Sequence, residues 1–362
     1  MKSDLRSFWQ GKKVFLTGHT GFKGSWLALW LQHLGADVWG YARAPEGEQN
    51  LFTQARVAQQ MHSVIADICD TERLMATLKD CQPDIVIHMA AQSLVRYSYQ
   101  HPIETYQTNV MGTVHILEAI RQIPTVRAVV NITSDKCYAN REMIWGYREN
   151  EPMGGYDPYS SSKGCAELVT EAYRNSFFMP AGIGLASARA GNVIGGGDWA
   201  VDRLVPDVLR ACIAKQNVVL RFPNAIRPWQ HVLDPLCGYL QLARLLYNDP
   251  IQYSQGWNFG PNQQKTYPVE KIVEELLQLW GGNYSQIEYH EHMQAHEAQS
   301  LMLDSAKAGR FLQWLPRWGM TDALQKIVAW HQHALYEDNM RAFTVQQIEE
   351  YLEEKEVCLQ TI

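Results

Sequence analysis

The sequence has no long apolar run and no excess of positive charge. Its densest apolar segment, residues 26–31, is six residues long, whereas a membrane-spanning helix needs about 20 apolar residues. The charged residues among the first 13 positions leave no room there for the apolar core of a secretory signal. The 32 Lys and Arg residues against 38 Asp and Glu residues give a net charge of −6. Because binders of nucleic acids and anionic membranes are usually basic, we expect neither partner.

Cysteine patterns are also missing. The seven cysteines are scattered, odd in number and form no C-x-x-C pair, which argues against a disulfide framework and against a zinc site. We therefore expect a cytoplasmic protein with no bound metal. The chain has 362 residues, of which 46% are hydrophobic and 19% are charged. This balance excludes a disordered chain, and the length corresponds to about two domains.

Short apolar runs alternate with helix-like stretches through the first half of the chain. The runs that predict strands are residues 13–16, 37–41, 62–66, 84–88 and 128–132. Residues 23–34 carry apolar side chains at helical spacing and predict the first helix of the series. Continuous apolar strands separated by helices predict an α/β fold with a doubly wound parallel sheet.

A glycine-rich turn directly follows the first predicted strand. Gly18, Gly21 and Gly24 form a G-x-x-G-x-x-G pattern before the first helix. Glycines let the backbone approach a pyrophosphate, and the helix N-terminus offers it free N–H groups and a positive dipole end. The turn therefore predicts a dinucleotide site, to which His19 and Lys23 add positive groups. The alternative is a purely structural turn.

These patterns predict two domains. Residues 1–185 form a Rossmann-like domain for the dinucleotide, to which a strand near residues 253–260 returns, and residues 186–362 form a smaller domain for the substrate. In such folds an acid about 20 residues after the glycine turn holds the ribose 2′-hydroxyl. Here the second strand leads into Arg43, with no acid in place. Arg43 can pair with a 2′-phosphate, so the local chemistry slightly favours NADP over NAD.

A Y-x-x-x-K pattern, Tyr159 to Lys163, lies beyond the fifth predicted strand. Residues four apart share a helix face, so the Lys163 ammonium is expected near the Tyr159 hydroxyl. A nearby cation lowers the pKa of a phenol from its ordinary value of about 10. Tyr159 is therefore a candidate base that removes a hydroxyl proton, although the pattern alone is common by chance. Ser134, Asp135 and Lys136 follow the fifth strand itself.

The order of these motifs resembles the extended branch of the short-chain dehydrogenase/reductase superfamily, over roughly residues 12–315. The resemblance places Asp67 and Ile68 at the adenine edge of a cofactor. It places Ala90 and Ala91 along the cofactor channel and makes Asn109 a landmark. The cofactor contacts that it implies are Gly18, Thr20, Gly21, Phe22, Lys23, Gly24, Arg43, Asp67, Ile68, Ala90, Ala91, Asn109, Tyr159 and Lys163.

Ser134-Asp135-Lys136 resembles the Thr-Asp-Glu pattern of nucleotide-sugar 4,6-dehydratases, and Ser-Asp-Lys-Cys-Tyr resembles the version found in CDP-glucose 4,6-dehydratases. The resemblance implies NAD, with NADP as the alternative. It implies oxidation at C4 of CDP-glucose by Ser134, Tyr159 and Lys163, with Asp135 as the acid at C6. Hydride return to C6 then gives CDP-4-keto-6-deoxyglucose and water, for deoxysugar biosynthesis toward cell-surface polysaccharide.

Lys136 departs from the Thr-Asp-Glu pattern and leaves the base at C5 open. As a base, Lys136 has to lose its proton near pH 7, which takes roughly 4–5 kcal/mol relative to an ordinary pKa of about 10.4. Alternatively, Lys136 stays charged and stabilises the enolate while another group takes the proton. A third interpretation is a surface salt bridge at the strand end.

The second half of the chain supplies candidate substrate contacts. The resemblance implies that Asn192 and Arg227 hold the sugar-nucleotide diphosphate. Arg203 and Leu204 open a predicted helix, where a cation and free N–H groups suit a phosphate. Arg221 is a candidate to stack on cytosine as a planar cation. Each arginine, taken alone, is as often part of a surface ion pair.

Two other interpretations are open. One is another 4,6-dehydratase or a 4-epimerase that acts on a dTDP-, GDP- or UDP-sugar. The other is a non-catalytic dinucleotide-sensing scaffold, although such proteins tend to lose Y-x-x-x-K. In the family that the sequence resembles, subunits associate through two helices, which implies a homodimer or a homotetramer. Residues 110–120 and 165–173 are the candidates for these helices.

Overall fold

The computed structural model describes residues 2–47, 49–220, 222–261, 267–281, 287–289 and 301–353. Arg221, the candidate for cytosine stacking, lies outside the described residues. No helix in the described ranges is both long enough and apolar enough to span a membrane. The described cysteines are all free thiols.

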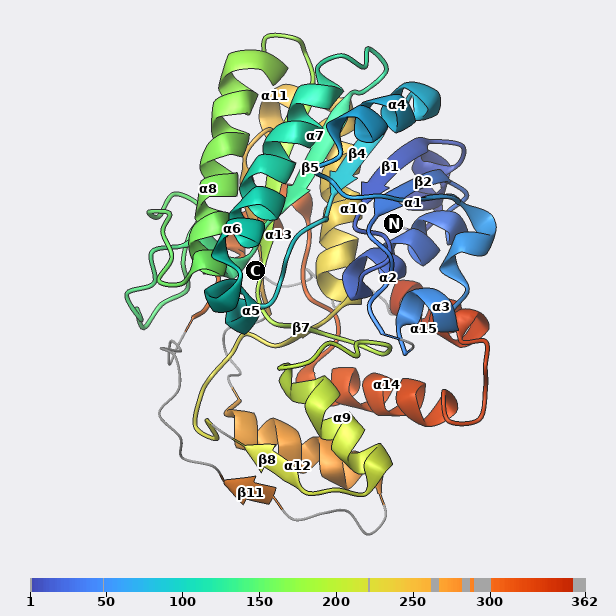
Figure 1. Cartoon of the computed structure of the whole chain (residues 1–362), viewed down its shortest axis with the longest axis vertical. Helices are drawn as coiled ribbons and strands as arrows, with labels where there is room; N and C mark the ends of the chain where they lie inside the picture. The colour runs from blue at the N-terminus through green and yellow to red at the C-terminus, as the bar shows by residue number, and fades with distance from the viewer. Residues whose placement is uncertain are drawn as a thin grey trace.

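A seven-stranded sheet lies at the centre of the upper part of the molecule (Figure 1). Its strands stand in the order β10-β6-β5-β4-β1-β2-β3, and every neighbouring pair is parallel. The strands are β1 (Lys13–Thr17), β2 (Asp37–Ala42), β3 (His62–Ile65), β4 (Ile85–His88), β5 (Ala128–Ile132), β6 (Gly184–Ala190) and β10 (Gly256–Phe259). The order reverses between β1 and β4, which is where doubly wound sheets bind ligands. The predicted α/β fold is confirmed.

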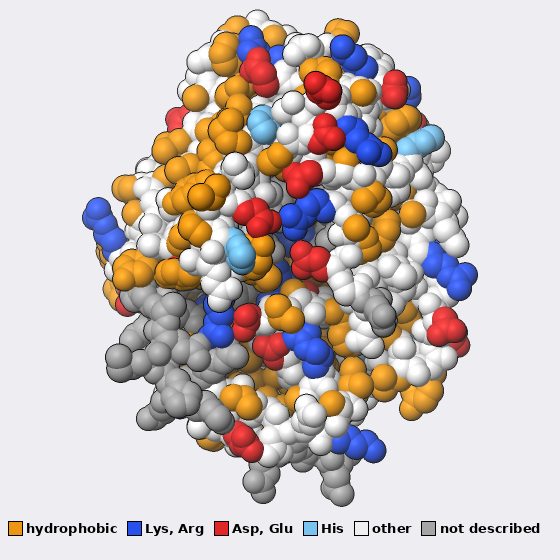
Figure 2. Space-filling model, viewed as in Figure 1, with side chains coloured by type: hydrophobic (Ala, Val, Ile, Leu, Met, Phe, Trp, Pro, Cys, Tyr) orange, Lys and Arg blue, Asp and Glu red, His pale blue; other side chains and the backbone are white. Residues whose placement is uncertain are grey.

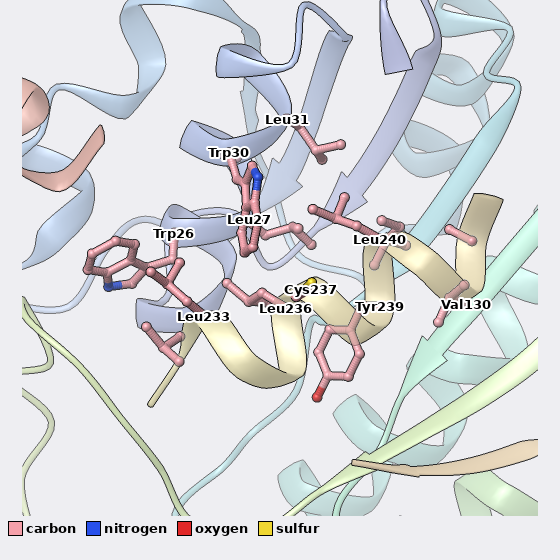
Figure 3. Close-up of a cluster of buried hydrophobic side chains, with 14 of the residues drawn as sticks. Trp26, Leu27, Trp30, Leu31, Val130, Leu233, Leu236, Cys237, Tyr239 and Leu240 are labelled. Atoms are coloured by element: carbon pink, nitrogen blue, oxygen red, sulfur yellow. The ribbon is translucent and has the colours of Figure 1, made fainter. Parts of the chain in front are cut away.

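Helices cover both faces of this sheet, because alternate side chains of each strand point to opposite faces. Val14 and Leu16 of β1 join a core under α2 (Phe22–His33), α10 (Leu233–Asn248) and α15 (Arg341–Glu353). Phe15, between them, joins a second core under α4 (Thr71–Cys81), α7 (Gly112–Ile120) and α8 (Pro158–Tyr173). Figure 3 shows the first core, in which Trp26 and Leu27 of α2 lie against leucines of α10.

A third core lies in the lower part of the molecule in Figure 1. It is built from α9 (Leu204–Ala214), β8 (Val218–Leu220), α12 (Val269–Trp280), β11 (Ile287–Tyr289) and α14 (Met320–His333). The two-stranded pairing of β7 (Val193–Ile194) with β9 (Gln230–His231) connects this part to the end of β6. β10 returns from the second half of the chain to pair with β6. The division of the chain near residue 185 stays a prediction.

Shorter elements complete the described chain. They are α1 (Lys2–Trp9), α3 (Leu51–Gln54), η1 (Val57–Gln60), α5 (Val95–Gln100), α6 (Pro102–Tyr106), η2 (Gln107–Met111), η3 (Asp135–Cys137), η4 (Arg174–Phe178), α11 (Pro250–Tyr253) and α13 (Ala306–Leu312). Two of these, α6 and η3, carry residues that are central to the site described below.

Candidate active site

The residues that follow β5 meet the first turn of α8. Asp157 caps α8, accepting hydrogen bonds from the Ser160 backbone N–H (2.9 Å) and hydroxyl (2.6 Å). This cap places Tyr159 in the first turn of the helix. The Ser134 hydroxyl donates to Asp135 Oδ1 (2.9 Å) and is also hydrogen-bonded to the Tyr159 side chain. The structure therefore brings three of the predicted catalytic side chains into one buried cluster.

Asp135 lies buried at the centre of this cluster. Burial raises the pKa of its carboxyl, while the nearby charge of Lys136 and the hydrogen bond from Ser134 act in the opposite direction. Its Oδ2 is buried and has no hydrogen-bond partner in the described part of the chain. The same oxygen lies 3.1 Å from where a Cβ on Gly191 would stand, so the strand end after β6 closes over it. Burial of this kind favours the protonated form of a carboxyl, which is the form that could deliver a proton to a leaving hydroxyl.

The expected effect of Lys163 on Tyr159 is not the dominant one. Burial raises the pKa of Tyr159 to about 12, and the hydrogen bond from Ser134 only partly offsets this. Burial also lowers the pKa of Lys163 to about 8, against the charge of Glu167. The Lys163 ammonium lies 3.5 Å from the carbonyl oxygen of Ile132. The prediction of a favoured phenolate is therefore wrong for the protein by itself, because burial disfavours both charged forms.

Lys136 lies at the edge of the cluster and is half-buried. Its backbone N–H donates to the Ser134 hydroxyl at 3.3 Å, which forms the cap of η3. Its charge acts on Asp135. This position is compatible with either of the roles expected at C5, and the choice between them stays a prediction.

The glycine turn fits a pyrophosphate. Gly18 has a φ of +77°, and a Cβ there would lie 2.8 Å from the Ala90 nitrogen. A Cβ on Gly24 would lie 2.0 Å from the Gly18 carbonyl oxygen. In the described structure, no side chain caps the N-terminus of α2 at Gly21, and the first turn of α2 carries no acid. Bare backbone and an uncapped helix N-terminus form a cradle for an anion.

The two positive groups predicted in this turn behave differently. His19 is buried, its Nε2 lies 2.7 Å from the Ser63 hydroxyl, and burial lowers its pKa to about 4. It is neutral at pH 7, so the prediction of a positive His19 is wrong. Lys23 points to α10, where its ammonium donates to the Tyr239 hydroxyl at 3.3 Å. Burial, followed by the charge of Lys163, lowers the pKa of Lys23 to about 7.

The remaining predicted cofactor residues gather at the carboxyl edge of β1, β2 and β4. Thr20 donates to the Arg43 carbonyl oxygen (2.9 Å), which ties the glycine turn to the end of β2. Asn109 exchanges hydrogen bonds with the backbone of Gln92 and donates to the Ser162 hydroxyl (2.8 Å). Phe22, Asp67, Ile68, Ala90 and Ala91 lie buried or half-buried along the same edge. Their contacts with a cofactor stay a prediction.

His88, at the end of β4, is a packed histidine. Its Nδ1 lies 2.7 Å from the Thr17 hydroxyl, and the Thr17 oxygen also accepts the backbone N–H groups of Met89 and Ala90 at 3.0 Å. Burial, followed by the charge of Lys163, lowers the pKa of His88 to about 3. His88 is therefore a neutral side chain that links the ends of β1 and β4 beside the site.

Two predicted substrate arginines approach the catalytic cluster. Arg203 stands at the N-cap position of α9, which begins at Leu204, but its side chain makes no capping hydrogen bond and instead pairs with the buried Asp198 at 2.9 Å. Its charge acts on Tyr159, and the charge of Arg227 acts on Asp135. Asn192 is linked to β9 through its backbone carbonyl oxygen, which accepts a hydrogen bond from the Gln230 backbone N–H at 3.0 Å. Figure 2 shows basic and acidic side chains together in the central hollow of this face.

Several residues of the site carry no distinct mark in the sequence. Asp198 forms an ion pair with Arg203, and Glu104 forms one with Arg43. The Tyr239 hydroxyl accepts a hydrogen bond from Lys23. Glu167 lies one turn beyond Lys163 on α8 and is the exception, because its spacing extends Y-x-x-x-K on the same helix face. Identifying the other three from the sequence would require knowing contacts between distant segments.

The fold and site define a protein of the short-chain dehydrogenase/reductase type, with a glycine turn that fits a pyrophosphate, a Ser134–Asp135–Tyr159 cluster, and Lys163 one turn beyond Tyr159 on α8. The chain belongs to the GDP-mannose 4,6-dehydratase family, whose sequence model matches residues 15–327. This confirms the resemblance to nucleotide-sugar dehydratases.

Individual relatives agree with this assignment. The chain is 55% identical over 352 residues to the CDP-glucose 4,6-dehydratase of Salmonella typhimurium, covering 96% of this chain and 98% of that protein. It is 27% identical over 350 residues to the dTDP-glucose 4,6-dehydratase of Neisseria gonorrhoeae, covering 89% and 96%. Among solved structures, the UDP-glucose 4-epimerase of Thermotoga maritima matches with a TM-score of 0.78 at 19% identity, covering 89% of this chain and 99% of that one.

Proposed function

We propose that this protein is an NAD-dependent CDP-glucose 4,6-dehydratase. The observation that carries the proposal is the 55% identity to a CDP-glucose 4,6-dehydratase over nearly the full length of both chains. The buried cluster of Ser134, Asp135 and Tyr159 supports it, because a dehydration needs an acid beside the oxidising pair. An epimerase has no use for a buried proton donor at the Asp135 position.

The residues of the first part of the chain would hold the cofactor. The glycine turn from Gly18 to Gly24 and the N-terminus of α2 fit the pyrophosphate, and the edge at Asp67 and Ile68 fits the adenine. A nicotinamide bound there supplies reversible hydride transfer, so it is regenerated in each turnover. The second part of the chain, from about residue 186, would hold the sugar nucleotide, with its phosphates between Asn192, Arg203 and Arg227.

The protein moves protons in two stages. In the first, the Tyr159 oxygen takes the proton of the sugar C4 hydroxyl, which Ser134 orients by hydrogen bonding. Because burial raises the pKa of Tyr159 to about 12, this transfer requires additional positive charge in the site. Lys163 and Arg203 are the protein's own cations placed to provide it.

In the second stage, the C4 ketone acidifies the C5 proton. Lys136 either takes this proton or stabilises the enolate that forms when it leaves. The C6 hydroxyl departs with the proton of Asp135 as one molecule of water. Burial raises the pKa of Asp135, which favours the protonated form that this step needs. Return of the hydride to C6 and of a proton to C5 would then give a 4-keto-6-deoxy sugar nucleotide, which suits deoxysugar biosynthesis for cell-surface polysaccharide.

The test is to incubate the protein with CDP-, dTDP-, UDP- and GDP-hexoses and to detect loss of one water by mass spectrometry. We expect dehydration of CDP-glucose, with deuterium placed at C4 found at C6 of the product. Asp135→Asn should lower the rate of dehydration at least a hundredfold, since general acids contribute about 10²–10⁴-fold. Tyr156→Phe, at an exposed tyrosine, is the matched control and should keep full activity. Label that stays at C4, or unchanged CDP-glucose, contradicts the proposal.

We also propose that two copies of the chain pair through α7 and α8. The apolar side chains of Met111, Leu168 and Phe177 are exposed on or beside these helices, and clustered exposed apolar side chains are typical of interfaces. Light scattering of the purified protein should give the mass of a dimer or a tetramer. The free thiols of the described cysteines fit the cytoplasm, where we propose that the enzyme acts.

A further inference from the structure

An ion pair stands where the adenosine ribose would reach the end of β2. The Arg43 guanidinium lies 3.1 Å from the Glu104 carboxylate, which comes from α6, 61 residues away in the chain. The Tyr97 hydroxyl donates to the other oxygen of Glu104 at 2.7 Å. Glu104 is therefore held from two sides, with one oxygen directed to Arg43.

This pair belongs to the cofactor side of the site. The Arg43 carbonyl oxygen accepts from Thr20 of the glycine turn, and the Gly18 backbone N–H donates to Tyr41 in the same strand at 2.9 Å. In doubly wound folds, the residue at the end of the second strand meets the ribose 2′-position, where an acid selects NAD and an arginine accommodates the extra phosphate of NADP. Arg43 alone would therefore favour NADP.

The charges around Arg43 reverse that preference. Glu46 lies 3.7 Å from the second guanidinium nitrogen, and the charge of Asp67 also acts on Arg43. One cation thus faces three carboxylates, Glu46, Glu104 and Asp67. A 2′-phosphate carries a charge of about −1.5 to −2 near neutral pH, so it would meet net negative charge and would have to displace Glu104 from Arg43. A 2′-hydroxyl meets neither obstacle.

We propose that Glu104 is the residue that makes this protein select NAD over NADP, by neutralising Arg43 and by repelling a 2′-phosphate. The inference rests on the proposed nicotinamide dinucleotide cofactor and adds the residue that sets its selectivity. It explains how an arginine at the end of β2 is compatible with an NAD enzyme. Because Arg43 is 55% exposed, the pair contributes little to stability, and Glu104 can be changed without unfolding the protein.

The test measures binding directly, by titrating NAD⁺ and NADP⁺ into the protein in a calorimeter at low ionic strength. Wild-type protein should bind NAD⁺ at least tenfold more tightly than NADP⁺. Glu104→Gln should reduce this preference about tenfold or more, mainly by tightening NADP⁺, and Glu104→Ala should act in the same direction. Adding Arg43→Ala to Glu104→Gln should remove the gained affinity for NADP⁺.

Glu118 offers a matched control on α7. Its carboxylate also pairs with an arginine, Arg121, and also accepts from a tyrosine, Tyr173 at 3.0 Å. Glu118→Gln should leave the NAD⁺ to NADP⁺ ratio unchanged. Equal binding of both dinucleotides by wild type, or an unchanged ratio in both Glu104 variants, overturns the proposed role of Glu104 but does not contradict the proposed cofactor. Failure of wild type to bind either dinucleotide overturns the proposed cofactor and, with it, this inference.

Discussion

Replacing Glu167 by alanine should destabilise the protein more than any surface substitution. Glu167 of α8 and Arg189 of β6 form a buried ion pair, with side chains 4% and 5% exposed. The pair is bidentate, with Nε to Oε1 at 2.9 Å and Nη2 to Oε2 at 2.8 Å. The hydroxyls of Thr133 and Ser187 also donate to the two carboxylate oxygens. One carboxylate thus connects α8 to the ends of β5 and β6.

The magnitude follows from what the substitution leaves behind. In Glu167→Ala, Arg189 stays buried without its bidentate partner and keeps hydrogen bonds to the Tyr138 hydroxyl (2.6 Å) and the Glu149 carbonyl oxygen (3.0 Å). Removing one partner of a buried pair costs about 3–5 kcal/mol. Burial raises the pKa of Glu167, but the charge and hydrogen bonds of Arg189, together with the hydrogen bonds from Ser187 and Thr133, bring it below its ordinary value of 4.5. The loss should therefore be the same at pH 6 and pH 8.

The assay is urea unfolding followed by tryptophan fluorescence. Arg148→Ala is the control, because it breaks an ion pair with Asp304 whose arginine is 70% exposed, and such pairs contribute about 0–1 kcal/mol. The free energy of unfolding should fall by about 3–5 kcal/mol in Glu167→Ala and by less than about 1 kcal/mol in the control. A loss in Glu167→Ala no larger than that of Arg148→Ala would refute the reasoning.

Two further predictions concern stability and cofactor binding. Burial raises the pKa of Asp234 to about 7 from 3.8, so the folded protein keeps a proton that the unfolded chain releases near pH 4. This contribution to stability is full below about pH 4 and declines by up to about 4 kcal/mol as pH rises to 7. Asp234→Asn should flatten that decline in urea unfolding at pH 5, 6 and 7; parallel curves for both proteins would contradict it. Gly24→Ala should abolish NAD⁺ binding in calorimetry, because its Cβ would meet the Gly18 carbonyl oxygen at 2.0 Å, whereas Gly309→Ala, with no neighbour closer than 3.6 Å, should bind normally.

Features that depend on neighbours along the chain can be read from the sequence alone. Apolar runs and helical spacing identify the strands and helices of the sheet, because side-chain periodicity is a local property. The glycine turn at Gly18–Gly24 is equally local, since a strand, a tight turn and a helix follow one another directly. The spacing of Tyr159 and Lys163 places both on one face of α8. These patterns predict the α/β fold, which the structure confirms, and they name candidate catalytic side chains that the structure brings close together.

The charge states and the partners of those side chains follow from the folded structure and not from local sequence patterns. Arg43 forms an ion pair with Glu104, and Lys23 donates a hydrogen bond to Tyr239, which lies 216 residues further along the chain. Local sequence patterns do not predict such contacts, because they join segments that are distant in the sequence. Burial raises the pKa of Tyr159 to about 12, raises the pKa of Asp135, and lowers the pKa of His19 to about 4. Desolvation and charge pairing depend on everything packed around a group. They therefore exist only once the chain has folded.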